Sequence, residues 1–346
     1  MATVFVGLSG GVDSALSAAL MKDAGHTVVG CFIKIWQPEF IECTWREDRL
    51  DAMRVCAALH IPFREIDLSE QYKAEVIEDM VANYKKGITP NPDVLCNRKI
   101  KFGSFAEWAF REGADYIATG HYARINNEGG RFSLLRGSDT NKDQSYFLWQ
   151  LTQKDLERAL FPVGAMTKQE VRAEAKRRAL PVAQKRDSQG LCFVGDISLP
   201  EFLSHYMPLK KGVVLDTNGS ACGEHDGAGL YTVGQRHGFS HTGSVPLYVS
   251  AIDIEKNTIT VSRQRADAES KKVIVIHENW IKEQHFPFHS EVQVRYREHP
   301  CMATTKRENN LCTVEFEKPH LVALGQSLLW YDQDIVLGGS IVTRPV

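Results

Sequence analysis

The chain has 346 residues, which is enough for two or three average domains and for a large buried core. Hydrophobic residues make up 43% and charged residues 24%, values that exclude collagen-like, disordered and membrane-bundle proteins. The net charge of −2 does not indicate a nucleic-acid binder, but local basic patches can still bind phosphates. No apolar run reaches the ~18–20 residues that span a bilayer. The apolar stretch 4–8 is too short for a signal peptide, so we expect a cytoplasmic protein.

Short apolar runs alternate with segments of helical spacing over the first third of the chain. The sequence predicts strands, in chain order, at 3–8, 27–35, 63–68 and 115–119. It predicts helices between these strands, at 13–24, 46–59 and 101–111. Parallel strands joined by helices bury both faces of their sheet. The alternation therefore indicates an α/β fold with a doubly wound parallel sheet.

The pattern changes to strand-like runs in the second half of the chain, after a hairpin that is expected around 126–130. Runs bounded by Gly, Asp, Asn or Pro recur at 212–215, 231–233, 247–254, 258–261, 272–276, 291–296, 312–316 and 327–331. Many short strands separated by turn residues predict one or two small all-β modules after the α/β domain.

Residues 166–187 form a basic stretch, within which 168–178 is predicted to be helical. The stretch holds seven Lys or Arg residues against three Asp or Glu residues. It is either a solvated helix face or a surface that binds the phosphate backbone of a nucleic acid, and the sequence leaves both interpretations open.

The most informative motif is a glycine-rich turn between the first predicted strand and the first predicted helix. It consists of Gly7, Leu8, Ser9, Gly10, Gly11, Val12, Asp13 and Ser14. Glycines let the main chain approach a ligand closely, and the N–H groups at a helix start attract anions, so the turn predicts a phosphate site. The pattern is neither a Walker A loop nor the Gly-x-Gly-x-x-Gly of dinucleotide-binding proteins. Asp13 is expected either to contact Mg²⁺ or only to favour the helix start.

The glycine-rich turn resembles the pyrophosphate loop of the ATP pyrophosphatase superfamily. That resemblance implies that the chain uses ATP, transfers its adenylate to a carbonyl oxygen and releases pyrophosphate.

The chain contains eight cysteines, none of them spaced as Cys-x-x-Cys, which disfavours a zinc ribbon or finger. Cys96 follows a stiff segment at 90–92 and is expected just before a helix that begins near Arg98. A helix N-terminus and the flanking Arg98 and Lys99 would favour its thiolate, and Asp93 could act as a base. The alternative is a structural cysteine in a loop.

Cys192 stands between Gly190 and Gly195, after the basic stretch. This composition predicts a mobile loop and an exposed, reactive thiol, although a structural role stays open. The other six cysteines are expected to be structural.

Several further motifs follow the glycine-rich turn in a fixed order. They are Asn-Pro-Asp-x-x-Cys at 91–96, Ala-Thr-Gly-His-Tyr at 118–122, Asn-Lys-Asp-Gln-Ser-Tyr-Phe-Leu at 141–148, Phe-Pro-Val-Gly at 161–164, Asp-Ser-x-Gly-x-Cys-Phe at 187–193 and Gly-Gln-Arg at 234–236. Together they resemble the tRNA-specific 2-thiouridylase family over essentially the whole chain. The resemblance implies a pyrophosphate-loop catalytic domain at 1–200, a small central β domain at 201–268 and a C-terminal β-barrel at 269–346.

The resemblance implies a sulfurtransferase that acts on the wobble uridine of the tRNAs for Lys, Glu and Gln. ATP, with Mg²⁺, would adenylate the C2 oxygen of the uridine. Cys192 would receive sulfur from a persulfide donor, either a cysteine desulfurase or a sulfur-relay protein, and would carry it as a persulfide. Cys96 would resolve this persulfide and form a transient disulfide with Cys192, and Asp93 would assist as a base.

Further residues match positions of that family. The match implies nucleotide contacts at Ile33 and Gly120, besides the glycine-rich turn. It implies tRNA contacts at Asn91, Pro92, Asp93, His121, Lys142, Asp143, Gln144, Arg295, Tyr296 and Gln326.

Three alternatives remain open from the sequence. One is a pyrophosphate-loop ligase that adenylates a small-molecule carbonyl or carboxylate and needs no paired cysteines. Another is an RNA-binding protein without catalysis, against which the intact loop and the two cysteines argue. The third concerns the cofactor, because Asp93, Cys96 and Cys192 could supply ligands to an iron–sulfur cluster, although the usual Cys-x-x-Cys is missing.

Overall fold

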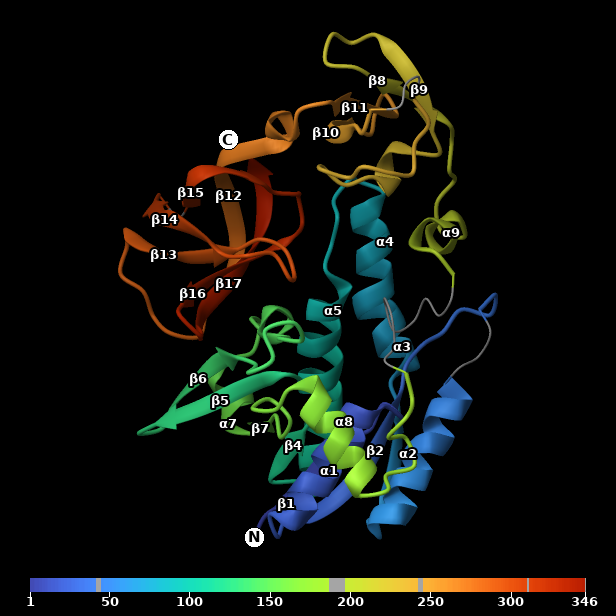
Figure 1. The fold of residues 1–346 in the computed structure, drawn as a ribbon, viewed down its shortest axis with the longest axis vertical. Coiled ribbons are helices and arrows are strands. Elements are labelled where there is room, and N and C mark those ends of the chain that lie inside the picture. Colours follow the sequence, from blue (N-terminus) through green and yellow to red (C-terminus); the bar gives the residue numbers. More distant parts are fainter. Residues whose placement is uncertain (42–44, 187–196, 242–244, 310, 346) are drawn as a thin grey trace.

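The computed structural model describes residues 1–41, 45–186, 197–241, 245–309 and 311–345. Its described residues form three sheets, which Figure 1 shows as three parts of an elongated molecule. None of the helices in these residues is long and apolar enough to cross a membrane.

The N-terminal part is built on a five-stranded parallel sheet with the order β3-β2-β1-β4-β7. Its strands are β1 (Thr3–Gly7), β2 (Thr27–Lys34), β3 (Phe63–Asp67), β4 (Tyr116–Ala118) and β7 (Ala159–Leu160). Successive β1 side chains face opposite sides, so Val4 and Val6 join one hydrophobic core and Phe5 joins another. Burial of both faces is typical of a doubly wound sheet, and this part of the prediction is confirmed.

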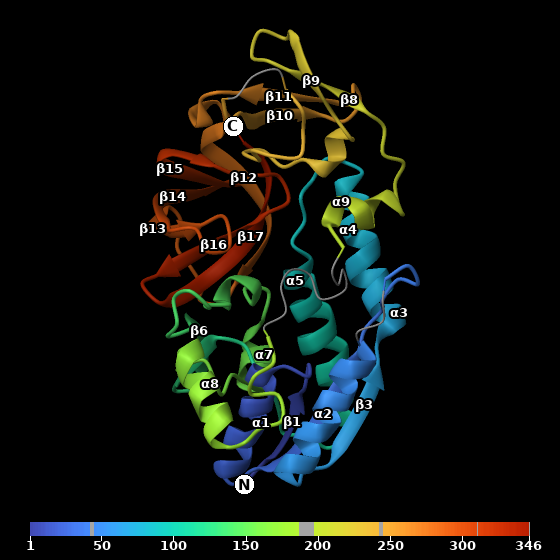
Figure 2. The ribbon, with the colours of Figure 1, turned by 45° about the vertical axis from the view of Figure 1, so that its right-hand side comes forward.

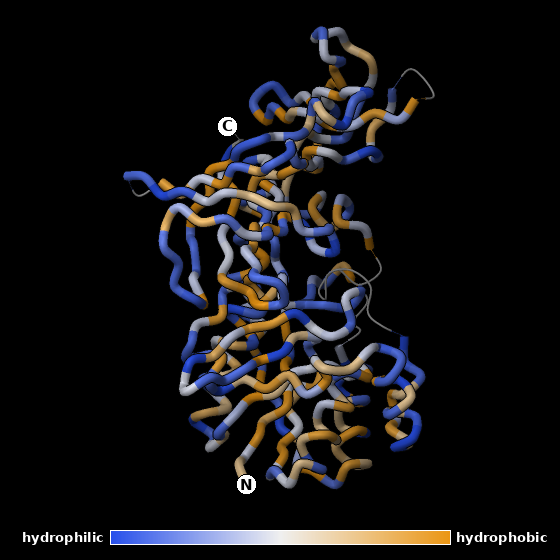
Figure 3. The backbone as a smooth tube through the Cα atoms, turned by 60° about the vertical axis from the view of Figure 1, so that its left-hand side comes forward, coloured by the Kyte–Doolittle hydropathy of each residue, from blue (hydrophilic) through white to orange (hydrophobic). Residues whose placement is uncertain are grey.

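Helices cover both faces of this sheet. One core is closed by α1 (Val12–Asp23), α2 (Trp45–Leu59) and α8 (Lys168–Arg177). The other is closed by α3 (Ser69–Tyr72), η1 (Lys73–Ile77), α4 (Glu78–Tyr84), α5 (Pro92–Leu95), η2 (Cys96–Phe105), α6 (Ala106–Arg111) and α7 (Gln153–Glu157). Figure 3 shows hydrophobic residues concentrated inside this part of the molecule and hydrophilic residues on its outer turns.

The central part is a four-stranded sheet with the order β10-β11-β8-β9. Its strands are β8 (Gly212–Leu215), β9 (Ala221–His225), β10 (Tyr248–Asp253) and β11 (Thr258–Ser262), preceded by α9 (Leu199–Ser204). It packs on the end of α4, where Gly229 leaves room for the Tyr84 carbonyl and Gly87 leaves room for Ile254. The strand predicted at 231–233 is wrong, because Tyr231 ends a single 3₁₀ turn at 228–230 and packs its ring into the central core.

The C-terminal part is a six-stranded antiparallel barrel, closed by pairing between its first and last strands. Its strands are β12 (Glu269–Trp280), β13 (Phe288–Gln293), β14 (Cys301–Glu308), β15 (Leu311–Leu321), β16 (Ser327–Asp332) and β17 (Ile335–Pro345). The barrel predicted from the family resemblance is therefore confirmed.

The hairpin predicted near 126–130 is confirmed, but it pairs with a distant part of the chain. It consists of β5 (Ala123–Glu128) and β6 (Arg131–Arg136), and β6 pairs with β17 of the barrel. Figures 1 and 2 show the hairpin lying beneath the barrel. Trp149 strengthens this junction, because its buried indole donates to Ser327 Oγ over 3.0 Å. The hairpin thus joins the N-terminal part to the barrel.

Candidate functional site

The glycine-rich turn connects β1, which ends at Gly7, to α1, which begins at Val12. Gly10 adopts a φ of +73°, and a Cβ there would lie 2.6 Å from the Asp48 carbonyl oxygen, so a glycine is required. Gly11 stands at the N-cap and has no side chain to occupy the first N–H groups of α1. The Ser14 hydroxyl accepts from Ser9 N over 3.2 Å and donates to Gly11 O over 3.1 Å. These contacts fix the turn and leave no side chain over the N–H groups at the start of α1, where an anion can bind. We call the turn Gly7–Ser14 the anion cradle.

The predicted nucleotide contacts lie beside this cradle. A Cβ on Gly7 would be 3.7 Å from Ile33 Cδ1 and 3.8 Å from Phe105 Cε1. A Cβ on Gly120 would lie 2.7 Å from Ser14 N, so any larger residue would displace the start of α1. β1 lies between β2 and β4 in the parallel sheet, and α1 follows its carboxyl end. Ligands of open α/β sheets bind at such a position, beyond the carboxyl ends of the strands.

Asp13 is engaged by a residue that the sequence analysis did not single out. Its carboxylate accepts from Lys168 Nζ over 2.7 and 2.8 Å and from the Tyr122 hydroxyl over 2.7 Å. The Lys168 side chain is 12% exposed and extends from the first position of α8. The pyrophosphate cradle therefore contains a lysine, although none occurs in the loop itself. No spacing rule connects residue 168 to residue 13, so only the fold reveals it.

The basic stretch is largely bound to the protein's own acidic groups. Lys185 pairs with Asp48 over 2.8 Å and with Asp51 over 2.7 Å, which ties the stretch to α2. Arg178 pairs with Asp23 and Glu174. These contacts neutralise much of the charge that the sequence offered to a nucleic acid, and they favour the interpretation of a packed and solvated helix.

The segment that carries Cys96 is helical earlier than predicted. Helical backbone begins at Pro92 rather than near Arg98, so Cys96 lies at the end of the first turn and not ahead of the helix. Cys96 is 8% exposed and packs in the hydrophobic core. The neighbouring cations point elsewhere, since Arg98 pairs with Asp155 over 3.2 Å and Lys99 with Glu75 over 3.6 Å. Both cations are therefore engaged by carboxylates, and their activation of the Cys96 thiol stays a prediction.

Residues 96–105 form a π-helix, a rare conformation that is often found at functional sites. Asn97, on its first turn, is buried and donates to the Phe147 carbonyl over 3.0 Å. Its Oδ1 has no hydrogen-bond partner among the described residues, which makes it an acceptor that the sequence analysis missed. Asp93 lies one turn earlier, and burial raises the pKa of its carboxyl, partly offset by the Lys101 ammonium. Burial therefore favours the uncharged form of this carboxyl.

His121 is only 5% exposed and lies between the cradle and the π-helix. Its Nδ1 is 2.7 Å from Thr119 Oγ1, and its Nε2 is 3.4 Å from Lys101 Nζ. Burial and the Lys101 ammonium lower the pKa of His121 well below its usual value, so the ring is neutral at physiological pH.

The loop that leads into Asn91 and Pro92 is held by both β domains. Gln326 Nε2 donates to the Thr89 carbonyl over 2.9 Å, and Thr89 N donates to the Leu324 carbonyl over 3.0 Å. Thr89 Oγ1 lies 2.8 Å from Thr232 Oγ1 of the central part. The Gln326 side chain, expected to face tRNA, is thus used to position this loop.

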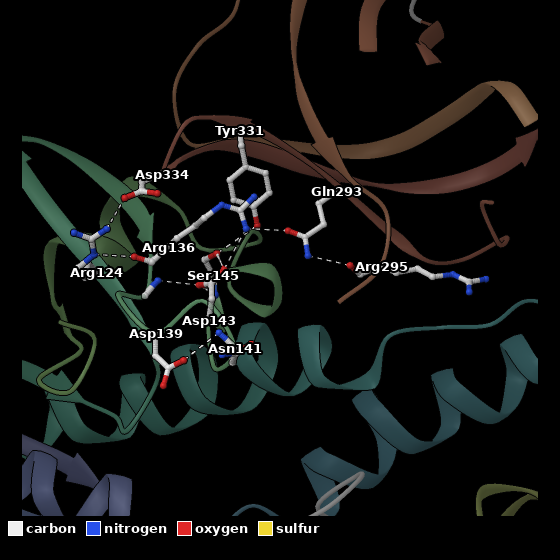
Figure 4. Close-up of polar contacts among 11 residues, drawn as sticks. Arg124, Arg136, Asp139, Asn141, Asp143, Ser145, Gln293, Arg295, Tyr331 and Asp334 are labelled. Carbon is white, nitrogen blue, oxygen red and sulfur yellow. Dashed lines mark hydrogen bonds and ion pairs between the residues drawn. The ribbon is translucent and has the colours of Figure 1, made fainter. Parts of the chain in front are cut away.

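The loop with Lys142, Asp143 and Gln144 is held in place by hydrogen bonds of its own side chains. The buried Asp143 carboxylate accepts from Gly137 N over 2.9 Å, from Ser145 N over 3.0 Å and from Arg136 Nη1 over 3.3 Å. Figure 4 shows Arg136 reaching from the end of β6 toward Gln293 and Tyr331 of the barrel. Gln144 Oε1 accepts from the Tyr122 main chain over 3.0 Å. Two of the three predicted tRNA contacts, Asp143 and Gln144, therefore direct their side chains toward the protein itself.

Arg136 is expected to stabilise this junction strongly. Its guanidinium also donates to Gln293 over 3.0 Å and lies 3.5 Å from the centre of the Tyr331 ring. Arg136→Met leaves the buried Asp143 carboxylate without its cation and should reduce the free energy of unfolding by about 3 kcal/mol. Urea denaturation of this variant against Arg131→Met, an exposed position of the same strand, measures the effect. Equal midpoints for the two variants would contradict this account.

Arg295 and Tyr296 follow β13 at the same junction. Arg295 Nη2 donates to the Val233 carbonyl over 2.8 Å and so links the barrel to the central part. The Tyr296 ring lies 4.5 Å from that of Phe147, between centroids. Cys192 lies outside the described residues, as do 187–191 and 193–196. In the part of the chain that the structure describes, no three His, Cys, Asp or Glu side chains are arranged to hold a metal ion.

Comparison with known proteins covers the whole chain. Residues 2–196 match the tRNA methyl transferase HUP domain, 200–263 the tRNA methyl transferase PRC-barrel domain, and 270–342 the aminomethyltransferase beta-barrel domain. A U34-tRNA thiolase from Methanococcus maripaludis gives a weak structural likeness, with a TM-score of 0.37 and 17% identity over 59% of this chain and 65% of that one.

The curated relatives are much more similar. The tRNA-specific 2-thiouridylase MnmA of Geobacillus thermodenitrificans is 41% identical over 98% of this chain and 94% of its own length. The protein of the same name from Alkaliphilus oremlandii is 40% identical over 99% of this chain and 97% of its own. The chain therefore belongs to the tRNA-specific 2-thiouridylase family of sulfurtransferases.

Proposed function

We propose that this protein is a tRNA 2-thiouridylase that replaces the C2 oxygen of the wobble uridine by sulfur in the tRNAs for Lys, Glu and Gln. One observation carries the proposal. The anion cradle at Gly7–Ser14 and the helical segment with Asp93 and Cys96 meet at one edge of the sheet. Phe105 of the π-helix faces Gly7, and Lys101 of the same helix contacts His121, which follows Gly120.

The first step activates the uridine. Its C2 oxygen attacks the α-phosphorus of ATP, the bond to the bridging oxygen breaks, and pyrophosphate leaves toward the N-terminus of α1. The N–H groups beyond Gly11 and the Lys168 ammonium offset the charge of pyrophosphate. Where Mg²⁺ accompanies the nucleotide, Asp13 would be the carboxylate beside the cradle to contact it, in exchange for its contact with Lys168.

The second step transfers sulfur. In the proposed sequence a donor protein leaves a persulfide on Cys192, and the Cys96 thiolate attacks the Cys192 sulfur. The bond between the two persulfide sulfurs breaks, hydrosulfide is released, and Cys96 and Cys192 form a disulfide. The hydrosulfide attacks C2 and AMP leaves with the original oxygen. A cellular dithiol then reduces the disulfide for the next turnover.

Asp93 and the loop before it are proposed to receive the uridine. A wobble base must leave the anticodon stack to enter a closed site. Gln326 and Thr232 fix the loop at Thr89, and Asn91, Pro92 and Asp93 follow directly. The protonated Asp93 carboxyl that burial favours can donate to the base, and its carboxylate form can take the N3 proton.

The experiment measures pyrophosphate release from ATP with and without unmodified tRNA for Glu, and 2-thiouridine in the same samples after a persulfide donor is supplied. The proposal expects pyrophosphate only with tRNA, and thiouridine only when Cys192 is present. Pyrophosphate release that is indifferent to tRNA would identify a small-molecule ligase. ATP-independent tRNA binding without pyrophosphate would identify an RNA-binding protein that has lost catalysis.

A further inference from the structure

The π-helix presents three basic side chains of which two have acidic partners. Arg98 pairs with Asp155 and Lys99 with Glu75. Lys101 has no carboxylate oxygen within 4.0 Å of its Nζ in any of the described ranges, and its Nζ lies 3.4 Å from Nε2 of the His121 ring. Lys101 is half-buried, and removing an ammonium from water without a nearby negative charge costs free energy. Binding an anion would offset this cost.

The groups around Lys101 do not neutralise it. An ammonium can only donate, so His121 Nε2 accepts, and Nδ1 carries the proton toward Thr119 Oγ1. The imidazole is therefore a neutral support that orients the ammonium. The Lys101 ammonium acts on the Asp93 carboxyl, but burial of Asp93 favours its uncharged form.

The position of Lys101 indicates which anion it would meet. His121 follows Gly120, whose main chain lies against Ser14 N at the start of α1. Lys101 also stands on the helix that carries Cys96 and, four residues later, Phe105 against Gly7. The ammonium thus lies between the phosphate cradle and the residues proposed to receive the base. The α-phosphate must lie between these two groups, because it is the phosphate that becomes bonded to the uridine.

We propose that Lys101 is an active-site cation that binds the α-phosphate of ATP and then the phosphate of the uridine adenylate. The inference rests on the proposed function, whose site it completes. During adenylation Lys101 stabilises the charge on the α-phosphoryl oxygens as pyrophosphate leaves. During sulfur transfer it stabilises the AMP dianion as the bond between C2 and the original oxygen breaks.

The test compares Lys101→Met and Lys101→Gln with Lys99→Met, which removes an exposed lysine from the same helix. Both Lys101 variants should bind α,β-methylene-ATP about tenfold more weakly in calorimetry. Both should release pyrophosphate about 100-fold more slowly in a single turnover with saturating tRNA and ATP. Affinity for tRNA, measured by filter binding, should stay within about twofold, and Lys99→Met should behave as wild type.

Each outcome supports or overturns the assignment of Lys101 to the α-phosphate. Lys101 variants that match Lys99→Met in both assays overturn the inference while the proposed function stands. A large loss of tRNA affinity with an unchanged rate at saturating tRNA would assign Lys101 to the tRNA backbone and also overturn it. Lys101→Gln removes the charge but keeps an N–H donor toward His121. It therefore tests the role of the charge even if Lys101→Met does not fold. If the wild-type chain releases no pyrophosphate with tRNA, the proposed function fails and the analogue affinity still decides the role of Lys101.

Discussion

A Cys96→Ser chain is expected to form no detectable 2-thiouridine, a loss of more than about three orders of magnitude, because serine cannot attack a persulfide sulfur. Cys96 is buried at the end of a helical turn, and serine is nearly the same size, so the fold should persist. Mass spectrometry of digested tRNA measures the product. The same variant should keep its tRNA affinity and should accumulate the persulfide on Cys192, which an alkylation assay detects. Cys192→Ser should also abolish the product, without any persulfide.

Cys56→Ser provides the matched control for these variants. Cys56 is a buried cysteine of α2, and burial raises the pKa of its thiol to about 11, which keeps it protonated and inert. It should retain full activity. A Cys96→Ser chain that still thiolates tRNA would contradict the resolving role, and loss of tRNA binding in that folded variant would reassign Cys96 to recognition.

The second large effect is expected at Lys168. Lys168→Met removes the cation that contacts both carboxylate oxygens of Asp13 beside the cradle. Pyrophosphate release should slow by about 100-fold and the KM for ATP should rise, because charge on the leaving group is no longer offset. Steady-state kinetics at varied ATP, together with tRNA binding, separates this effect from misfolding.

Lys176→Met on the same helix is the control, since Lys176 is exposed. It should show wild-type kinetics. Equal kinetics for the two variants would show that Lys168 only anchors α8 to α1.

The strands and helices of the α/β part could be predicted because the spacing of hydrophobic residues and the length of each apolar run can be read locally from the sequence. The same periodicity could not reveal the π-helix at 96–105. Phe102 and Phe105 of this helix pack in the core, and the local pattern of apolar residues carries no signal for its widened turns. The start of the helix at Pro92 was missed, although a proline at the first helical position is a known signal.

Motif matching located the site but not the orientation of its polar side chains. Gly120 and Ile33 lie beside the glycine-rich turn, because backbone proximity follows from the fold. Asp143 and Gln326 instead direct their polar atoms inward to hold loops. A polar residue in a motif can contact a ligand or support the residue that does, and only tertiary contacts distinguish the two.

The β5–β6 hairpin has a consequence for how the protein is made. Its partner in pairing, Ile335 of β17, is synthesised 200 residues after Leu135. At ~5–20 residues per second the ribosome needs roughly 10–40 s to deliver it. Throughout that interval β6 has an unpaired edge and Trp149 lacks Ser327, its hydrogen-bond partner. The nascent chain therefore joins this hairpin to the barrel only after β17 has been synthesised, and truncation before β17 leaves an aggregation-prone edge.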